Sequence, residues 1–147
     1  MSGRAVVERY AEALAKNDTE LIQQLLHPDY VGRYPQSGEV IRGPANLIGI
    51  AEHYPGAGGG NLSTDVREVR GDDDKFIAPP IPIWNVIHVS GSGDEFSMTG
   101  TTRYPNGEIW HSVVFITMRD GKIWRQTDYF APPFEIPEWR TPYVERE

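Results

Sequence analysis

Residues 119–130 of this chain read RDGKIWRQTDYF. The Asp-Gly pair near the start is a strong signal for a β-hairpin, because both residues tolerate the positive φ angles of a tight turn. The apolar run HSVVFITM, residues 111–118, comes directly before this turn, so the two runs predict a pair of antiparallel strands. On a regular second strand, Asp128 shares one face with Trp124, Gln126 and Phe130.

More strands precede this hairpin. Three prolines stand at the front of APPIPIWNVIHV, residues 78–89, so strand pairing is expected only from about residue 83. The turns SGSGDE (90–95) and PNG (105–107) frame two further strands, and NLSTDVREV (61–69) alternates weakly. We therefore expect four or five antiparallel strands in the second half of the chain.

The first half of the chain predicts three helices. Apolar residues recur at helical spacing over residues 4–16 and again over 21–26, where Pro28 ends the pattern. A third helix is expected from Pro44 to about Tyr54, before the glycine-rich run PGAGGGN. Helices followed by strands indicate one α+β domain over residues 1–147, with three N-terminal helices packed on one face of a curved antiparallel sheet.

Composition limits the possible functions. A net charge of −7 with scattered Lys and Arg argues against a nucleic-acid partner. The chain has no cysteine, and its four histidines lack metal-ligand spacing, so no metal site is expected. No apolar run suits a signal peptide or a membrane span, which predicts a cytoplasmic protein without a membrane partner. The doubly apolar run HSVVFITM predicts a homodimer, because its second face needs cover.

Three segments resemble the nuclear transport factor 2-like superfamily, which includes SnoaL-like polyketide cyclases and ketosteroid isomerases. They are VVERYAEALAKND (6–18), LHPDYVGRYPQSGEVIRG (26–43) and RDGKIWRQTDYF (119–130). The resemblance, over residues 4–130, implies a cone with an internal pocket, usually dimeric through its sheet. The fold hosts isomerases, cyclases, dehydratases, epoxide hydrolases and non-enzymatic binders.

The resemblance also implies roles for single residues. Tyr10 matches the isomerase tyrosine that hydrogen-bonds the enolate oxygen, and Asp128 stands where SnoaL-like cyclases carry an aspartate. At the position that matches the general-base aspartate of the isomerase, this chain has Tyr34. The isomerase's second acid and the cyclase's histidine both fall near Val114. The chain thus retains only part of either site.

Asp128 is the main catalytic candidate from the residues alone. A carboxylate on an aromatic wall is poorly solvated, which raises its pKa and suits acid/base chemistry near neutral pH. The competing interpretation is a structural aspartate paired with an arginine or with amides of the tail. Tyr10 is either an oxyanion donor or a core tyrosine. His111 is a secondary base candidate, because it enters the site only if a bulge reverses its strand.

The expected ligand surface is aromatic. Trp84, Trp110 and Trp124 lie on strands and, with Tyr34, Gln126 and Phe130, predict a pocket for a small apolar molecule. We expect a cofactor-independent isomerase, cyclase or dehydratase acting on a carbonyl or epoxide compound. The alternative is a non-catalytic ligand-binding or dimeric interaction module of the same fold.

Residues 131–147 form a tail rich in proline and aromatic residues. Its prolines favour extended geometry and exclude a regular helix or a central strand. Phe134, Trp139 and Tyr143 are too apolar to remain in water. The tail is therefore expected to be ordered and to lie across its own surface or that of a partner.

Overall fold

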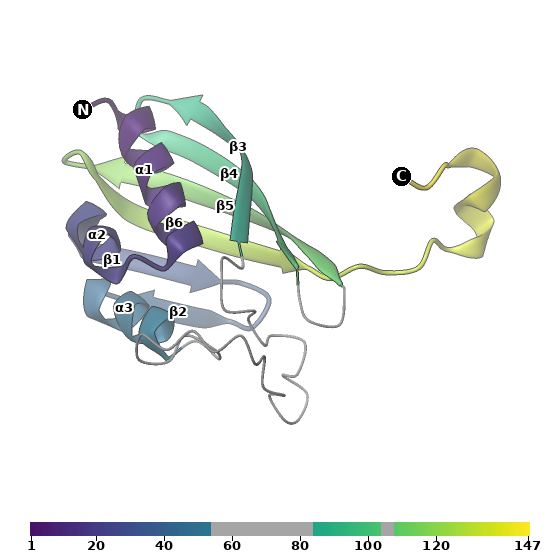
Figure 1. Cartoon of the computed structure of the whole chain (residues 1–147), viewed down its shortest axis with the longest axis horizontal. Coiled ribbons are helices and arrows are strands. Elements are labelled where there is room, and N and C mark those ends of the chain that lie inside the picture. The colour runs from purple at the N-terminus through teal and green to yellow at the C-terminus, as the bar shows by residue number, and fades with distance from the viewer. Residues whose placement is uncertain (54–83, 104–107) are drawn as a thin grey trace.

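The computed structural model describes residues 1–53, 84–103 and 108–147 (Figure 1). Its helices and strands are, in chain order, α1 (Gly3–Lys16), α2 (Thr19–Leu25), β1 (Leu26–Tyr34), β2 (Glu39–Arg42), α3 (Pro44–Glu52), β3 (Trp84–Ser92), β4 (Glu95–Arg103), β5 (Ile109–Arg119), β6 (Lys122–Ala131) and the 3₁₀ helix η2 (Glu138–Tyr143). The strands form one open, six-stranded sheet in the order β2-β1-β6-β5-β4-β3.

The helices begin and end where the sequence indicates. The Ser2 side chain caps α1 by accepting a hydrogen bond from the amide of Ala5, and Asp18 caps α2 by accepting from the amide of Leu21. Asn17 adopts the left-handed conformation between the two helices, with a φ of 53°. Pro44 opens α3, where its missing amide hydrogen is not needed. All three predicted helices are confirmed.

The predicted order of helices and strands is wrong in one respect. Two strands, β1 and β2, lie between α2 and α3, and β1 pairs in parallel with β6. The sheet is therefore mixed and not wholly antiparallel. Pro28 does end the helical pattern, but the chain continues as a strand with a register shift between Leu26 and Val31, and such an irregularity accommodates a proline.

The hairpin between β5 and β6 is formed as predicted. Asp120 and Gly121 have φ angles of 53° and 73°, as a two-residue turn of type I′ requires. Gly93 has a φ of 63° in the turn between β3 and β4. The predicted strand at 61–69, the glycine-rich run and the turn at 105–107 lie outside the described residues.

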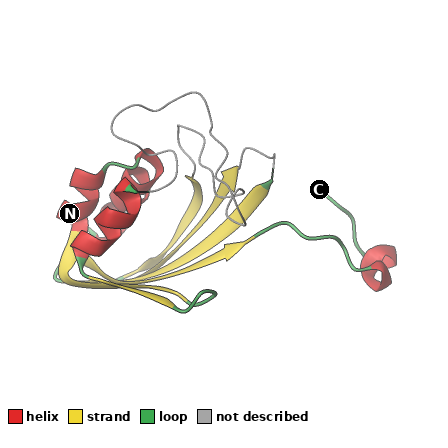
Figure 2. Ribbon diagram, turned by 90° about the horizontal axis from the view of Figure 1, so that it is seen from below, coloured by secondary structure: helices red, strands yellow, loops and turns green. Residues whose placement is uncertain are grey.

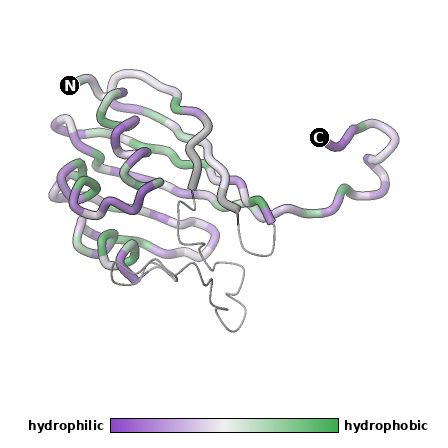
Figure 3. Tube along the Cα trace, in the orientation of Figure 1, coloured by the Kyte–Doolittle hydropathy of each residue, from purple (hydrophilic) through white to green (hydrophobic). Residues whose placement is uncertain are grey.

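One face of the curved sheet is covered by the helices, and Figure 2 shows them together on that side. Figure 3 shows hydrophobic colour recurring along the helices and the central strands. The buried core combines α1, through Val7 and Tyr10, with residues of the central strands such as Met98 and Ile116. We call this covered side the inner face of the sheet.

The opposite side is the outer face, and it carries exposed apolar side chains. Phe115 on β5 and Tyr129 on β6 are 52% and 42% exposed, and their rings meet edge to face with centroids 6.3 Å apart. Ile109 is also exposed on β5. The doubly apolar character predicted for β5 is thus confirmed.

The C-terminal tail points away from the sheet of its own chain. Residues 132–147 leave the end of β6 and extend beyond the sheet in both views (Figures 1 and 2). Prolines do not prevent all helical structure, since Glu138–Tyr143 form a 3₁₀ turn that includes Pro142. The expectation that the tail lies across its own surface or that of a partner stays a prediction.

Candidate functional site

Asp128 and Gln126 lie next to each other on the inner face of β6. Their partners across β5 are Val114 and Ile116, which are both buried. Gln126 is 3% exposed and Asp128 is 8% exposed. The hairpin register therefore places two polar side chains in the apolar layer between sheet and helices, where each needs a hydrogen-bond partner.

Two tyrosines from other elements complete the site. The Tyr10 hydroxyl on α1 donates to Gln126 Oε1 at 2.5 Å, and the Tyr30 hydroxyl on β1 donates to the same oxygen at 3.1 Å. Gln126 Nε2 donates to Asp128 Oδ1 at 2.8 Å. Only this orientation of the amide serves an ionised Asp128, because a carboxylate can accept hydrogen bonds but cannot donate them.

Burial controls the protonation of this network. It raises the pKa of Asp128 to about 7, and the hydrogen bond from Gln126 opposes that shift. Burial also raises the pKa of Tyr10 and of Tyr30 well above their ordinary value. Both tyrosines therefore keep their protons near neutral pH and act as donors, whereas Asp128 exists in both forms.

The two oxygens of Asp128 differ. Oδ1 accepts the bond from Gln126, while Oδ2 has no hydrogen bond and no cation beside it within the described residues. Trp124 Nε1 is the one fully buried side-chain nitrogen or oxygen of the described residues that lacks a partner. Among the described residues, one oxygen of the carboxyl is therefore anchored and the other has no hydrogen-bond partner.

Tyr34 and Phe130 lie beside Asp128 and are both only partly buried. Their rings meet edge to face with centroids 5.3 Å apart. Gln36, in the turn between β1 and β2, holds Phe130 from outside: its Nε2 donates to the Phe130 carbonyl at 2.6 Å, and its Oε1 accepts from the Phe130 amide. This side-chain bridge fixes the end of β6 against β1.

Trp110 and Ser112 also point to the inner face, from β5. Both are buried, as the alternation along that strand predicts, and Ser112 pairs with Phe130 in the register. The Trp110 indole nitrogen donates to Glu108 at 2.9 Å. The structure thus brings Tyr10, Tyr34, Trp110, Gln126, Asp128 and Phe130 to one face of the sheet.

Trp124 does not share that face, and its prediction as a ligand-binding residue is wrong. Thr117 pairs with Arg125 and Met118 with Ile123, so Trp124 is the extra residue of a β-bulge. The guanidinium of Arg125 lies 4.0 Å from the centre of the indole ring, and that of Arg119 lies 5.1 Å from it. The bulge lets Ile123 join the inner face in its place.

His111 does not enter the site either. It is exposed on the outer face of β5, and no bulge interrupts the pairing of that strand with β4. Its selection as a base is therefore wrong. Tyr10 is in the site, but its ring is fully buried and its hydroxyl is bonded to Gln126, so the structure does not support a direct oxyanion role. The side chain of Trp84 lies outside the described residues.

Tyr30 is the site residue that the sequence analysis did not select. It lies two residues after Pro28, where no strand was predicted, and the pairing of β1 with β6 places it beside Gln126. Alternation along β1 is interrupted by the register shift, so the segment offers little periodic signal. Parallel pairing between distant strands leaves no local mark in a sequence.

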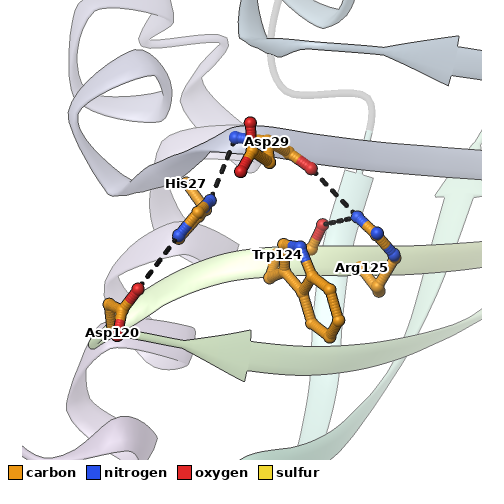
Figure 4. Close-up of polar contacts among 5 residues, drawn as sticks. All are labelled: His27, Asp29, Asp120, Trp124 and Arg125. Atoms are coloured by element: carbon orange, nitrogen blue, oxygen red, sulfur yellow. Dashed lines mark hydrogen bonds and ion pairs between the residues drawn. The ribbon is translucent and has the colours of Figure 1, made fainter.

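His27 lies in a second polar cluster near the other end of β6. Its Nδ1 accepts from the Asp29 amide at 3.0 Å, and its Nε2 lies 3.2 Å from an Asp120 carboxylate oxygen (Figure 4). Figure 4 also shows Arg125 donating to the carbonyls of Asp29 and Trp124. This cluster ties β1 to the end of β6 and lies apart from Asp128 in the strand.

The described residues hold no group of three or more His, Cys, Asp or Glu side chains suited to a metal ion. None of the helices in those ranges is long and apolar enough to cross a membrane.

Comparison with known proteins identifies the family. The SnoaL-like domain family matches residues 7–126, which ends just before Asp128. An NTF2-like protein of unknown function from Burkholderia xenovorans is 27% identical, with a TM-score of 0.70, over 99% of this chain and 94% of that chain. A candidate ketosteroid isomerase from Kribbella flavida is 24% identical, with a TM-score of 0.75, over 99% and 89%.

A more distant structure is an LEH-like epoxide hydrolase from M. tuberculosis, 16% identical with a TM-score of 0.57 over 87% of this chain and 81% of that one. At this identity the likeness concerns the fold alone. No curated protein matches the chain. The family match covers most of the chain, and the similar structures share its NTF2-like fold, so this protein belongs to the SnoaL-like domain family.

Proposed function

We propose that the protein is a cofactor-independent acid/base enzyme in which Asp128 carries the proton. The observation that supports this most is the state of the Asp128 carboxyl: it is buried, burial raises its pKa to about 7, and one of its oxygens is anchored by Gln126. A general base or acid works best when its pKa lies near the working pH, because both of its forms are then populated.

The substrate we propose is a small, largely apolar carbonyl or epoxide compound. Tyr34 and Phe130 offer aromatic surface beside Asp128, and Trp110 lies on the same face. Small-molecule sites are usually lined by apolar side chains with a few polar groups among them. The candidate isomerase and the epoxide hydrolase with this fold act on compounds of these two kinds, which supports the proposal by analogy only.

With a carbonyl substrate, ionised Asp128 accepts a proton from a carbon beside the carbonyl. The C–H bond breaks, an O–H bond forms on Oδ2, and the electron pair moves to the carbonyl oxygen as an enolate. Return of the proton to another carbon gives isomerisation, and its delivery to a departing hydroxyl gives dehydration. With an epoxide, ionised Asp128 takes one proton of a water whose oxygen bonds to a ring carbon. The ring C–O bond breaks, its electron pair stays on the ring oxygen as an alkoxide, and the proton held by Asp128 is then returned to that oxygen to give a diol.

Tyr10, Tyr30 and Gln126 are positioning residues in this scheme. The two hydroxyls hold the amide, and the amide holds Oδ1, so Oδ2 keeps one direction without reorganisation during the reaction. This assignment replaces the oxyanion role first considered for Tyr10.

The alternative is a non-catalytic binding module. This alternative is supported by the side-chain hydrogen bonds of Gln126, which all join it to other side chains of the protein, as in a purely structural polar network. In that case Asp128 serves only to orient a bound molecule or to complete the core.

Proton exchange with deuterated water separates these two functions. A panel of small apolar ketones is incubated with the protein in D₂O, and loss of the protons next to the carbonyl is followed by NMR; a parallel panel of epoxides is followed by incorporation of ¹⁸O from water. We expect exchange or opening for one class, and a loss on the order of 10²–10⁴-fold in Asp128→Asn. Equal rates in the wild type and in folded Asp128→Asn would reject Asp128 as the proton carrier.

A further inference from the structure

The C-terminal arm, residues 132–147, contains a 3₁₀ turn and extends beyond the sheet. Arg140 donates its amide to the Pro137 carbonyl, the Thr141 hydroxyl donates to the Glu138 carbonyl, and Arg146 lies 3.9 Å from Glu135. The Arg140 guanidinium also lies over the Trp139 ring. Within the described part of the chain, every hydrogen bond, ion pair and ring contact of the arm stays inside the arm.

The arm nevertheless carries large apolar side chains. Phe134 and Trp139 are each 75% exposed, and Tyr143 is 85% exposed. Aromatic residues of this size are the side chains that dominate protein–protein contacts, where their apolar area is removed from water. Three of them on one arm indicate a docking element and not a solvated terminus.

The geometry of the arm's start directs it away from its own chain. Pro132 and Pro133 follow β6 directly, and each proline holds its own φ near −65° and disfavours helical geometry in the residue before it. The chain therefore continues outward in extended form instead of reversing onto β6. Figures 1 and 2 show the 3₁₀ turn of the arm lying well beyond the sheet.

The arm leaves from the strands that carry the exposed apolar patch. Ala131, the last residue of β6, pairs with His111 of β5, and the patch of Ile109, Phe115 and Tyr129 lies on the outer face of the same two strands. One chain thus exposes two apolar surfaces, one on the arm and one on the strands from which the arm leaves, and the arm's direction keeps the first from covering the second. A two-fold pairing of identical chains covers both at once, because each surface on one copy meets the other copy.

We propose that two copies of the chain exchange their C-terminal arms, each arm packing Phe134, Trp139 and Tyr143 against the partner beside the outer face of its β5 and β6. A second copy of the chain is the partner for which both surfaces are already known, since it brings the same arm and the same patch. The proposal does not depend on the enzymatic function, because it uses no residue of the Asp128 network.

A photoreactive benzoylphenylalanine at position 139 tests where the arm docks. Ultraviolet irradiation of the full-length protein is expected to give adducts of two chains, mapped by mass spectrometry to β5 and β6 of the second copy. The same probe at position 50, on α3, is the control, since Ile50 is exposed on the helical side. Adducts within one chain would overturn the proposal in favour of an arm that folds back, and no adducts at position 139 would overturn it in favour of an arm in solvent.

Truncation gives an independent measurement. A chain ending at Ala131 is expected to dimerise at least 100-fold more weakly in sedimentation equilibrium, while its circular dichroism and thermal transition at high dilution match the full chain. An unchanged dissociation constant would overturn the proposal. Trp139→Ala and Phe134→Ala in the full chain provide the same comparison without shortening it.

Discussion

At the residue scale, Asp128 makes the fold less stable when it is ionised. Its folded pKa of about 7 exceeds the ordinary value of 3.8, so the unfolded chain loses the proton first as pH rises. The free energy of unfolding should therefore fall between about pH 4 and pH 7 through this group and level off above. A shift of this size corresponds to on the order of 4 kcal/mol.

Asp128→Asn isolates that contribution, because asparagine resembles the protonated acid and does not titrate. Urea denaturation at several pH values should show equal stability of the variant and the wild type near pH 4 and a more stable variant at pH 8. A variant less stable than the wild type at pH 8 would mean that the ionised carboxylate is well compensated, which contradicts the raised pKa.

Gln126 should control the pKa of Asp128 more strongly than Tyr10 does. Gln126→Leu removes the donor to Oδ1, so the pKa of Asp128 should rise further and any base-dependent activity should move to higher pH. Tyr10→Phe removes one of two hydroxyls on Oε1, and Tyr30 still holds the amide. NMR titration of the Asp128 carboxyl carbon in the two variants measures the difference, and equal shifts would refute the positioning role of Gln126.

At the scale of single elements, the bulge in β6 decides which side chains reach the site. Trp124→Ala should leave the pKa of Asp128 unchanged, because the indole stacks with Arg119 and Arg125 and not with the carboxyl. The cost in stability should exceed about 1 kcal/mol, because the variant loses both cation–π contacts and the apolar area of a ring whose nitrogen is buried. Carboxyl titration and urea denaturation of the variant check both parts; a lower Asp128 pKa would place Trp124 back in the wall of the site.

Local signals in the sequence account for most of this fold and part of the site. The caps of α1 and α2, the Asp-Gly turn and the alternation along β5 could be recognised because each depends on neighbouring residues. Bulges and parallel pairing could not, since the bulge at Trp124 and the contact of β1 with β6 depend on distant strands. The positions of Asp128 and Gln126 could be predicted because they depend on the local hairpin. The position of Tyr30 and the true side of Trp124 could not, because they depend on pairing with a distant strand and on a bulge.

At the scale of the whole molecule, the outer face predicts a dimer of twice 16.6 kDa. Phe115 lies at the centre of the exposed patch, in ring contact with Tyr129. Phe115→Lys places a charge in the predicted interface, where it would be desolvated without a partner, so the dimer should dissociate at micromolar concentration. Light scattering after size-exclusion chromatography measures the mass directly.

Ile50→Lys provides the matched control for this prediction. Ile50 is 39% exposed, comparable with Phe115, but it lies on α3 on the helical side of the sheet. The same charge there should leave the dimer intact, which separates a local interface effect from a general effect of added lysine on association. If both variants remain dimeric, the outer face of β5 and β6 is not the interface, and a wild-type protein that is monomeric at micromolar concentration would reject the dimer altogether.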